Sequence, residues 1–426
     1  MRLFLVFLIT TAGFGKATAQ IDPRDPNSCR PIWQVVNDAL ERDPRTALAA
    51  AGFDEAAANV AAARARYLPQ ISTVNTVGVG DGRLVDNQVD NRLGIQASQH
   101  IFSFGAAGLA MDERRLDRQA ALFGTIAADQ ETALEAAVAV VNLWRVRQLI
   151  DISERRLEAY ESDLKAVQAL FDSRMATSVL LTEVEANVAL VQLTLARLTN
   201  EEIFAKARLA RLAGSETVCA SERWIGELLE SLQDRSVDKT VSDALSLSPV
   251  VSRLEVQADS ARTARKRIGR ERYPELRVSA FTANEYSDFP NESDNVNRLG
   301  LNLRADFISG GRVRAERAAA AARVRAAEAQ AGIVRTQLTE EITAAWTIVN
   351  SQRSILSTLD VAIDSLSEQR RLREDEFAFG AASQRDLLNA TTALYDAEAQ
   401  RIEALAEYYS NGMTLIYLAD VQYERQ

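Results

Sequence analysis

Apolar residues recur at alternating three- and four-residue steps along two long stretches of the chain. On the first stretch these positions are Leu157, Tyr160, Leu164, Val167 and Phe171, and on the second they are Ile348, Ile355, Leu359, Ala362 and Leu366. This spacing is typical of helices that pack against neighbours along their whole length. Residues 106–171 contain no proline. The pattern therefore predicts one helix there, which at 1.5 Å per residue would be about 100 Å long.

Both stretches end at short turns, at about residues 173–178 and 378–383. In the second turn Gly380 permits a sharp reversal of the backbone, and Ser383 can cap the next helix, where the dipole favours the negative charge of Asp386. Beyond the turns the apolar stripe continues at Val184, Val188, Val191, Leu195 and Leu198, and at Leu387, Ala390, Leu394 and Ala397. These patterns predict two helical hairpins with polar tips.

Ahead of each hairpin the hydrophobic period changes from about 3.6 to 2, which is the period of a strand. We expect strands at about 71–80 and 92–102, after an Ala-rich helix over 32–66, and again at about 276–286 and 297–308. Because successive side chains of a strand point to opposite faces, the pattern predicts one apolar and one polar face. The residues expected on the apolar face are Leu299, Leu301, Leu303 and Phe307, and those expected on the polar face are His100, Asn302, Arg304 and Asp306.

The landmarks of the first half return in the second half about 205 residues later. Asp38-Ala39-Leu40 is echoed by Asp243-Ala244-Leu245, Pro44 by Pro249, Pro69 by Pro274, Phe102 by Phe307 and Gly105 by Gly310, and Phe171 matches Phe377 at 206. This offset indicates a tandem repeat. We assign residues 20–213 to the first repeat, 214–239 to a connector and 240–426 to the second repeat. The expected fold class is mainly α with a small β part.

The amino terminus predicts export. Residues 1–19 combine Arg2, an apolar run and the small residues Ala17-Thr18-Ala19, which is the pattern of a secretory signal peptide. We expect no later segment to be apolar enough to cross a membrane as a helix. The two cysteines, Cys29 and Cys219, are equally consistent with one disulfide bond and with two free thiols.

Strands of about 9 to 11 residues are long enough to cross a bilayer when tilted. A single hairpin would more simply be a ribbon on a soluble protein. Export, the second hairpin and the uncovered apolar face from 299 to 307 favour the outer membrane. Four strands cannot close a barrel, and open edges are not tolerated in hydrocarbon. Oligomerisation is therefore required, with eight strands in a dimer or twelve, and room for a lumen, in a trimer.

Composition excludes several classes of function. The formal net charge of −10 argues against a nucleic-acid partner. A lone histidine, His100, without clustered cysteines cannot build a usual zinc site, and the motifs of hydrolases and nucleotide-binding enzymes are missing. We therefore expect neither enzymatic activity nor a cofactor.

The order of these elements, together with the segment GAASQRDLLNATTALYDAEAQ from Gly380 to Gln400, resembles the TolC-type outer-membrane efflux proteins over nearly all of the mature chain. The resemblance implies a homotrimer whose twelve-stranded barrel in outer-membrane lipid continues into the periplasm as an α-helical barrel. It also implies a passive exit duct of a type I secretion or tripartite efflux system. A periplasmic adaptor and an inner-membrane pump of the ABC or RND type would supply energy and selection.

The resemblance also implies a gate at the second tip. Asp386 matches the position of an acidic ring that narrows the periplasmic mouth, and the next family aspartate position is Asn389 here. Phe377 and Ala382 stand where some members carry Tyr and Arg that tie the entrance closed. At the first tip, a repeat offset of 203 would make Glu183 equivalent to the acidic position of Asp386. An offset of 206 would align Glu183 with a different position. An ordinary acid at a helix terminus explains Asp386 equally well.

Two other classes of protein compete with the export duct. A periplasmic coiled-coil adaptor or scaffold would have one helical hairpin flanked by compact β domains, and an exported enzyme would need a site that the sequence does not show. The two strand hairpins favour the duct. The sequence does not indicate whether the cargo is a protein, a drug or a metal.

Overall fold

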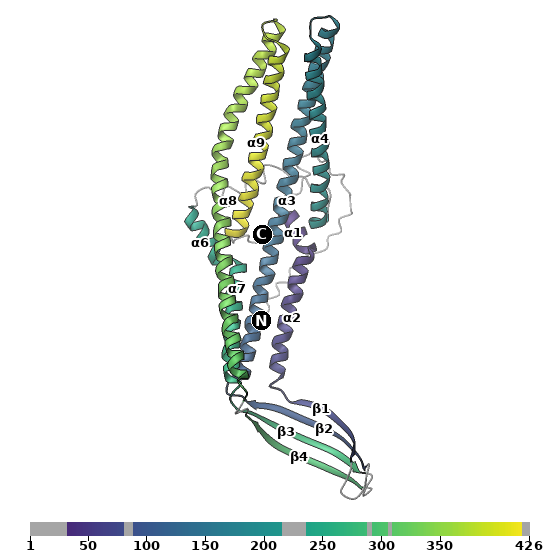
Figure 1. Cartoon of the computed structure of the whole chain (residues 1–426), viewed down its shortest axis with the longest axis vertical. Coiled ribbons are helices and arrows are strands. Elements are labelled where there is room, and N and C mark those ends of the chain that lie inside the picture. Colours follow the sequence, from purple (N-terminus) through teal and green to yellow (C-terminus); the bar gives the residue numbers. More distant parts are fainter. Residues whose placement is uncertain (1–31, 81–87, 215–235, 288–291, 306–308, 420–426) are drawn as a thin grey trace, which may run out of the picture.

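The computed structural model describes residues 32–80, 88–214, 236–287, 292–305 and 309–419. These residues form an elongated molecule with long helices and one small sheet at its lower end in Figure 1. The helices are α1 (Ile32–Arg42), α2 (Pro44–Ala65), α3 (Ala106–Asp172), α4 (Ser178–Ala213), α6 (Val237–Leu247), α7 (Pro249–Arg270), α8 (Arg312–Ala378) and α9 (Gln384–Ala419). The signal peptide, Cys29, Cys219, most of the connector, Asp306 and Phe307 lie outside the described residues.

The two halves have helices of the same lengths. The helices α1 and α6 have 11 residues each, α2 and α7 have 22, α3 and α8 have 67, and α4 and α9 have 36. Both long helices start after a glycine with positive φ, Gly105 at 87° and Gly311 at 85°. The offset is therefore 206 from this point on, and Gly105 is equivalent to Gly311 and not to Gly310.

The segment expected as one helix over 32–66 is instead two helices. Pro44 occupies the first turn of α2, where its missing N–H costs nothing, and Asp43 caps this turn by accepting from the Arg45 backbone N–H at 2.8 Å. The second half makes the same break at Pro249, where Ser248 accepts from the Val251 N–H at 3.3 Å.

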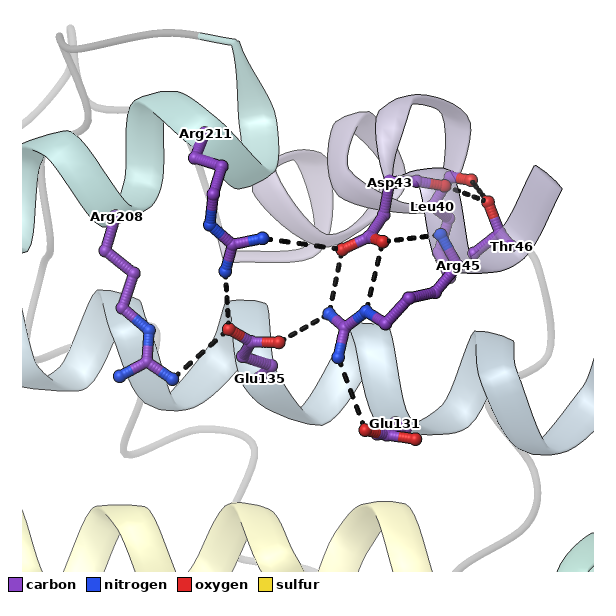
Figure 2. A network of polar contacts seen from close by, with 8 residues as sticks. All are labelled: Leu40, Asp43, Arg45, Thr46, Glu131, Glu135, Arg208 and Arg211. Carbon is purple, nitrogen blue, oxygen red and sulfur yellow. Dashed lines mark hydrogen bonds and ion pairs between the residues drawn. The ribbon is translucent and has the colours of Figure 1, made fainter. Parts of the chain in front are cut away.

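Figure 2 shows that Asp43 also belongs to an ion network that joins the start of α2 to α3 and α4. Arg45 binds the Asp43 carboxylate at 2.8 and 3.0 Å and also contacts Glu135, and Arg211 lies 2.7 Å from Glu135. Arg208 donates to Glu135 at 3.2 Å. The side chain of Asp43 is only 2% exposed, so Arg45 and Arg211 replace its hydration.

The strands form one antiparallel sheet in the order β1-β2-β3-β4, with β1 at Gln70–Gly80, β2 at Gln88–Phe102, β3 at Glu275–Ser287 and β4 at Glu292–Arg304. The two hairpins are joined by the pairing of β2 with β3. This leaves β1 and β4 as the edges of the sheet. Both β2 and β4 begin four or five residues before the predicted starts at 92 and 297.

The register assigns the side chains of the sheet to two faces. Leu299, Leu301 and Leu303 are opposite Ala280, Val278 and Leu276. These three leucines are 80%, 71% and 69% exposed. Asn302 and Arg304 alternate with them on the other face, which His100 shares because it pairs with Arg277, the partner of Asn302.

The six longer helices form a layer that continues the order of the strands, and the short helices pack on it, α1 against α3 and α4 and α6 against α8 and α9. In the half near the sheet, neighbouring helices follow the order α2, α3, α7, α8. In the half near the tips, they follow the order α4, α3, α9, α8. The main hydrophobic core lies between these helices and includes the edge-to-face pair of Trp144 and Tyr409, whose ring centroids are 5.5 Å apart. By length and composition alone α4 could cross a membrane, so the expectation that no later helix would qualify is wrong.

Candidate functional site

The two helical tips have the same backbone geometry. In the first turn the N–H groups of Met175 and Ala176 both donate to the Leu170 carbonyl, and in the second turn Ala381 and Ala382 both donate to Glu376. Arg174 and Gly380 occupy the same position with φ of 61° and 73°. Glycine adopts this conformation without the steric cost that Arg174 bears.

This geometry sets the offset between the tips at 206 residues. The position equivalent to Asp386 is therefore Leu180, and Glu183 is equivalent to Asn389. The first tip has Thr177 as its N-cap, which accepts from the Leu180 N–H at 3.3 Å. A carboxylate that mirrors Asp386 is therefore missing from the first tip.

Asp386 closes a capping box at the start of α9. Its Oδ2 accepts from the Ser383 backbone N–H at 3.0 Å and from the Ser383 hydroxyl at 2.7 Å, and its own backbone N–H lies 3.2 Å from Ser383 Oγ. The hydrogen bonds from Ser383 lower the pKa of Asp386. The carboxylate is thus charged at neutral pH, and it is exposed to solvent within one chain.

The two hairpins are linked at the tips by contacts that sequence reasoning missed. Arg385 of α9 donates to Glu183 Oε2 of α4 at 2.5 and 3.2 Å. The buried Gln384 donates to Asp163 Oδ1 of α3 at 2.9 Å, and burial raises the pKa of Asp163. These partners are 202 and 221 residues apart in the sequence, so no local pattern could reveal them.

The aromatic residues of the second tip differ in their surroundings. Phe377 is half-buried near the end of α8, whereas Phe379 is 89% exposed. Leu387 of α9 is buried, and Asn389, three residues after Asp386, is exposed. The Phe379 ring is therefore not packed into the hydrophobic core of one chain.

The polar face of the sheet carries its own cluster where the strands meet the helices. The His100 ring nitrogen Nδ1 lies 2.9 Å from Glu275 Oε1, which also accepts from Arg277 Nε at 2.8 Å. Asn302 donates to the Ser279 hydroxyl at 2.8 Å. Across the described ranges, no three His, Cys, Asp or Glu side chains are grouped so that they could hold a metal ion.

Comparison with known proteins finds one family along most of the chain. The family described as outer membrane efflux protein matches residues 35–215 and 240–419, one match in each half. The outer membrane efflux protein BepC of Brucella suis biovar 1 (strain 1330) is 21% identical over 357 residues, which cover 80% of this chain and 76% of BepC. The outer membrane protein TolC of Salmonella enteritidis is 20% identical over 404 residues, which cover 91% of this chain and 81% of TolC.

The fold is also that of a solved channel. The crystal structure of the Campylobacter jejuni CmeC outer membrane channel aligns with a TM-score of 0.79 at 13% identity and covers 97% of this chain and 93% of CmeC. The family matches in both halves extend over most of the chain. The chain therefore belongs to the outer membrane efflux protein family and provides an exit duct across the outer membrane.

Proposed function

We propose that three copies of this chain close into one continuous tube that spans the outer membrane and reaches into the periplasm. The observation that carries this proposal is the sheet with two free edges, β1 and β4, and one face of exposed leucines. In hydrocarbon every backbone polar group needs a partner, so β4 of one copy pairs with β1 of the next. Three copies give twelve strands and leave room for a lumen, whereas a dimer would have a barrel filled by its own side chains.

The edges of the helical layer support the same closure. The helices α4 and α8 lie at these edges in the half near the tips. Both leave large apolar side chains exposed within one chain, namely Leu190, Ile203 and Phe204 on α4 and Ile333, Ile355 and Val361 on α8. Contact between neighbouring copies would remove this surface from water.

Light scattering of the full chain in detergent tests the trimer. We expect a protein mass of three mature chains, and conductance after insertion into planar bilayers. A monomer or dimer that still conducts would overturn the twelve-stranded arrangement.

In this arrangement the leucine face contacts lipid, and His100, Asn302 and Arg304 face the lumen. The alternation in β4 supports this assignment, since its leucines are opposite in direction to Asn302 and Arg304. Single cysteines at positions 301, 302, 303 and 304, treated with a water-soluble thiol reagent in intact outer membranes, test it. Positions 302 and 304 should react through the lumen, and equal labelling at 301 and 303 would contradict the assignment.

The tips form the periplasmic mouth in this proposal. Asp386, repeated by symmetry, gives a ring of three carboxylates, with Asn389 one helical turn further along α9. The pair of Arg385 and Glu183 holds the two hairpins of each copy together. The aromatic side chain of Phe379, exposed in one chain, would be covered by neighbouring tips or by a partner, and Gly380 permits the turn that presents it.

We assign the duct a passive role without catalysis of its own. A periplasmic adaptor binding near the tips and an inner-membrane pump of the ABC or RND type would drive export. Family membership supports this partnership, and the joining of both hairpins in one sheet argues against the alternative of a periplasmic adaptor or scaffold. Co-purification of the full chain with a periplasmic adaptor from the same cells tests the assignment. Recovery of the chain without any adaptor after cross-linking in intact cells would contradict it.

A further inference from the structure

A cavity of about 560 Å³ lies where the sheet meets the lower ends of α2, α3 and α7. Its sheet side is formed by residues of the polar face, among them His100, Glu275 and Arg277. A second cavity of about 480 Å³ adjoins it and shares Arg66 and Tyr67 with it. Such volumes are within the usual range for small-molecule sites. If this face lines the lumen, as proposed above, the cavity opens into the duct where the barrel meets the helical tube.

The cavity has more positive than negative charge, although the chain as a whole has a net charge of −10. Four arginines and two glutamates line it. Arg267 bonds to Glu113 at 2.8 Å and to Glu271 at 2.6 Å, and Arg277 bonds to Glu275. Both glutamates of the lining, Glu271 and Glu275, are therefore already paired with an arginine.

Two guanidinium groups of the lining are left without a carboxylate. Arg66 and Arg270 are both exposed, and neither forms an ion pair with any of the residues that the structure describes. A guanidinium that lacks a carboxylate is available for an external anion, which it can bind through two parallel hydrogen bonds.

Aromatic rings lie beside these free guanidinium groups. The Tyr67 ring meets His100 edge to face at 5.9 Å, and Tyr273 stacks on Phe104 at 5.6 Å. Arg270 and Arg272 lie over the Tyr273 ring at 5.7 and 4.9 Å, and Arg272 also donates to its hydroxyl at 3.0 Å. Tyr67 and Tyr273 both line the cavity, where their rings can contact another ring at an edge or a face.

We propose that this cavity binds aromatic carboxylates, with Arg66 and Arg270 holding the carboxylate and Tyr67 and Tyr273 contacting the ring. The inference rests on the proposed function only for the opening of the cavity into the duct. Passing cargo of this class would be concentrated at the junction, because two uncompensated positive charges per copy attract anions.

Calorimetric titration of the detergent-solubilised full chain with benzoate tests the proposal. Acetate supplies the charge without the ring, and benzyl alcohol supplies the ring without the charge. We expect benzoate to bind at least about tenfold more tightly than either, since charged hydrogen bonds and ring contacts each contribute on this scale. The double variant Arg66→Gln/Arg270→Gln should lose about tenfold or more in affinity for benzoate.

A matched control separates the cavity from general charge effects. Arg64 of α2 and Arg265 of α7 lie close in sequence to Arg66 and Arg270 and are exposed, but they do not line the cavity. The variant Arg64→Gln/Arg265→Gln has the same change in charge and should bind benzoate as the parent does. Equal losses in both double variants, or acetate binding as tight as benzoate binding, would overturn the proposal.

Conductance in potassium chloride distinguishes this proposal from the duct itself. A protein that conducts as a trimer but does not bind benzoate refutes the cavity site and leaves the duct intact. A protein that binds benzoate through Arg66 and Arg270 but does not conduct supports the site and refutes the duct.

Discussion

The two halves of the chain build helices of the same order and lengths with different side chains. Each half breaks its first helical segment just before a proline, Pro44 in the first half and Pro249 in the second. The first half uses Asp43 as the cap at this break, and the second half uses Ser248. Asp43 forms ion pairs with two arginines, Arg45 and Arg211, whereas Ser248 accepts from one backbone N–H. At the offset of 206, Arg208 and Arg211 become Thr414 and Tyr417.

This difference shows which features define the repeat. Helix lengths, the proline at the break and the glycine before each long helix are the same in both halves, and they determine the backbone. The polar contacts that hold the break together differ, so each half can have its own sensitivity to mutation and to acid. The first half, with an ion network around a buried carboxylate, should be the more sensitive one.

Substitution of the two caps should produce the largest difference between the halves. Asp43→Ala removes a cap, worth about 1 kcal/mol, and the charged hydrogen bonds to Arg45, worth roughly another 1–2 kcal/mol. Ser248→Ala removes only the cap and should cost about 1 kcal/mol. Thermal unfolding followed by circular dichroism at one scan rate measures both. Equal losses would mean that the network adds nothing to the cap.

Acid should affect the first half before the second. The hydrogen bond from Arg45 lowers the pKa of Asp43. Burial alone would raise the pKa of Glu135, but Arg45, Arg208 and Arg211 outweigh it and lower this pKa too. A carboxylate with a lowered folded pKa stabilises the fold above its unfolded pKa, about 3.9 for Asp and 4.3 for Glu. This stability is lost as the pH falls through the folded pKa.

The unfolding temperature should therefore stay level down to about pH 5 and fall below it. Asp43→Asn keeps a side-chain oxygen for the cap and removes the charge, so its decline between about pH 5 and pH 3 should be shallower than that of the parent. Ser248→Ala should decline in parallel with the parent. Parallel curves for all three proteins would show that Asp43 does not titrate on unfolding in this range.

Much of the fold followed from periodicity, because alternation and coiled-coil spacing are local properties. For example, alternation along the strand predicted that Leu301 and Asn302 point to opposite faces of the sheet. The break at Asp43 was missed although Asp43 and Pro44 carry the local signal of a helix start, a capping acid followed by proline in the first turn. The adjacent glycines Gly310 and Gly311 hid the change of offset from 205 to 206, since either can adopt positive φ. The link between Arg385 and Glu183 depends on the packing of two hairpins, which no local spacing encodes.

The tips extend the comparison, since in the described part of the chain the ion pair of Arg385 with Glu183 connects the two halves there, beside the hydrogen bond from Gln384 to Asp163. If the hairpins separate when the mouth opens, Arg385→Gln should raise the ratio of open to closed channels by up to about fivefold, as an exposed pair contributes roughly 0.2–1 kcal/mol. Open probability in planar bilayers measures this ratio. Arg373→Gln is the control, because Arg373 pairs with Glu376 on its own helix at 2.7 Å.

Exchange of the two charges tests whether the pair itself is responsible. The double variant Glu183→Arg/Arg385→Glu should restore the parental open probability. If Arg373→Gln opens the channel as much as Arg385→Gln, the effect is one of net charge, and the link between the hairpins has no part in gating.

The smallest expected effect comes from Asp386, whose equivalent in the first tip is Leu180. Three Asp386 carboxylates converging on one axis would attract cations, so neutralising them should reduce cation selectivity, by about twofold at low salt. The change should disappear in concentrated salt, because the Debye length falls from about 30 Å at 0.01 M to 3 Å at 1 M. Reversal potentials across a salt gradient measure it.

Two variants of Asp386 separate its charge from its role as a cap. Asp386→Asn removes the charge and leaves an oxygen for Ser383, whereas Asp386→Ala also removes the capping box. The two variants should therefore share the loss of selectivity and differ in stability. Selectivity that survives both substitutions at low salt would mean that Asp386 only caps α9 and that the constriction lies elsewhere.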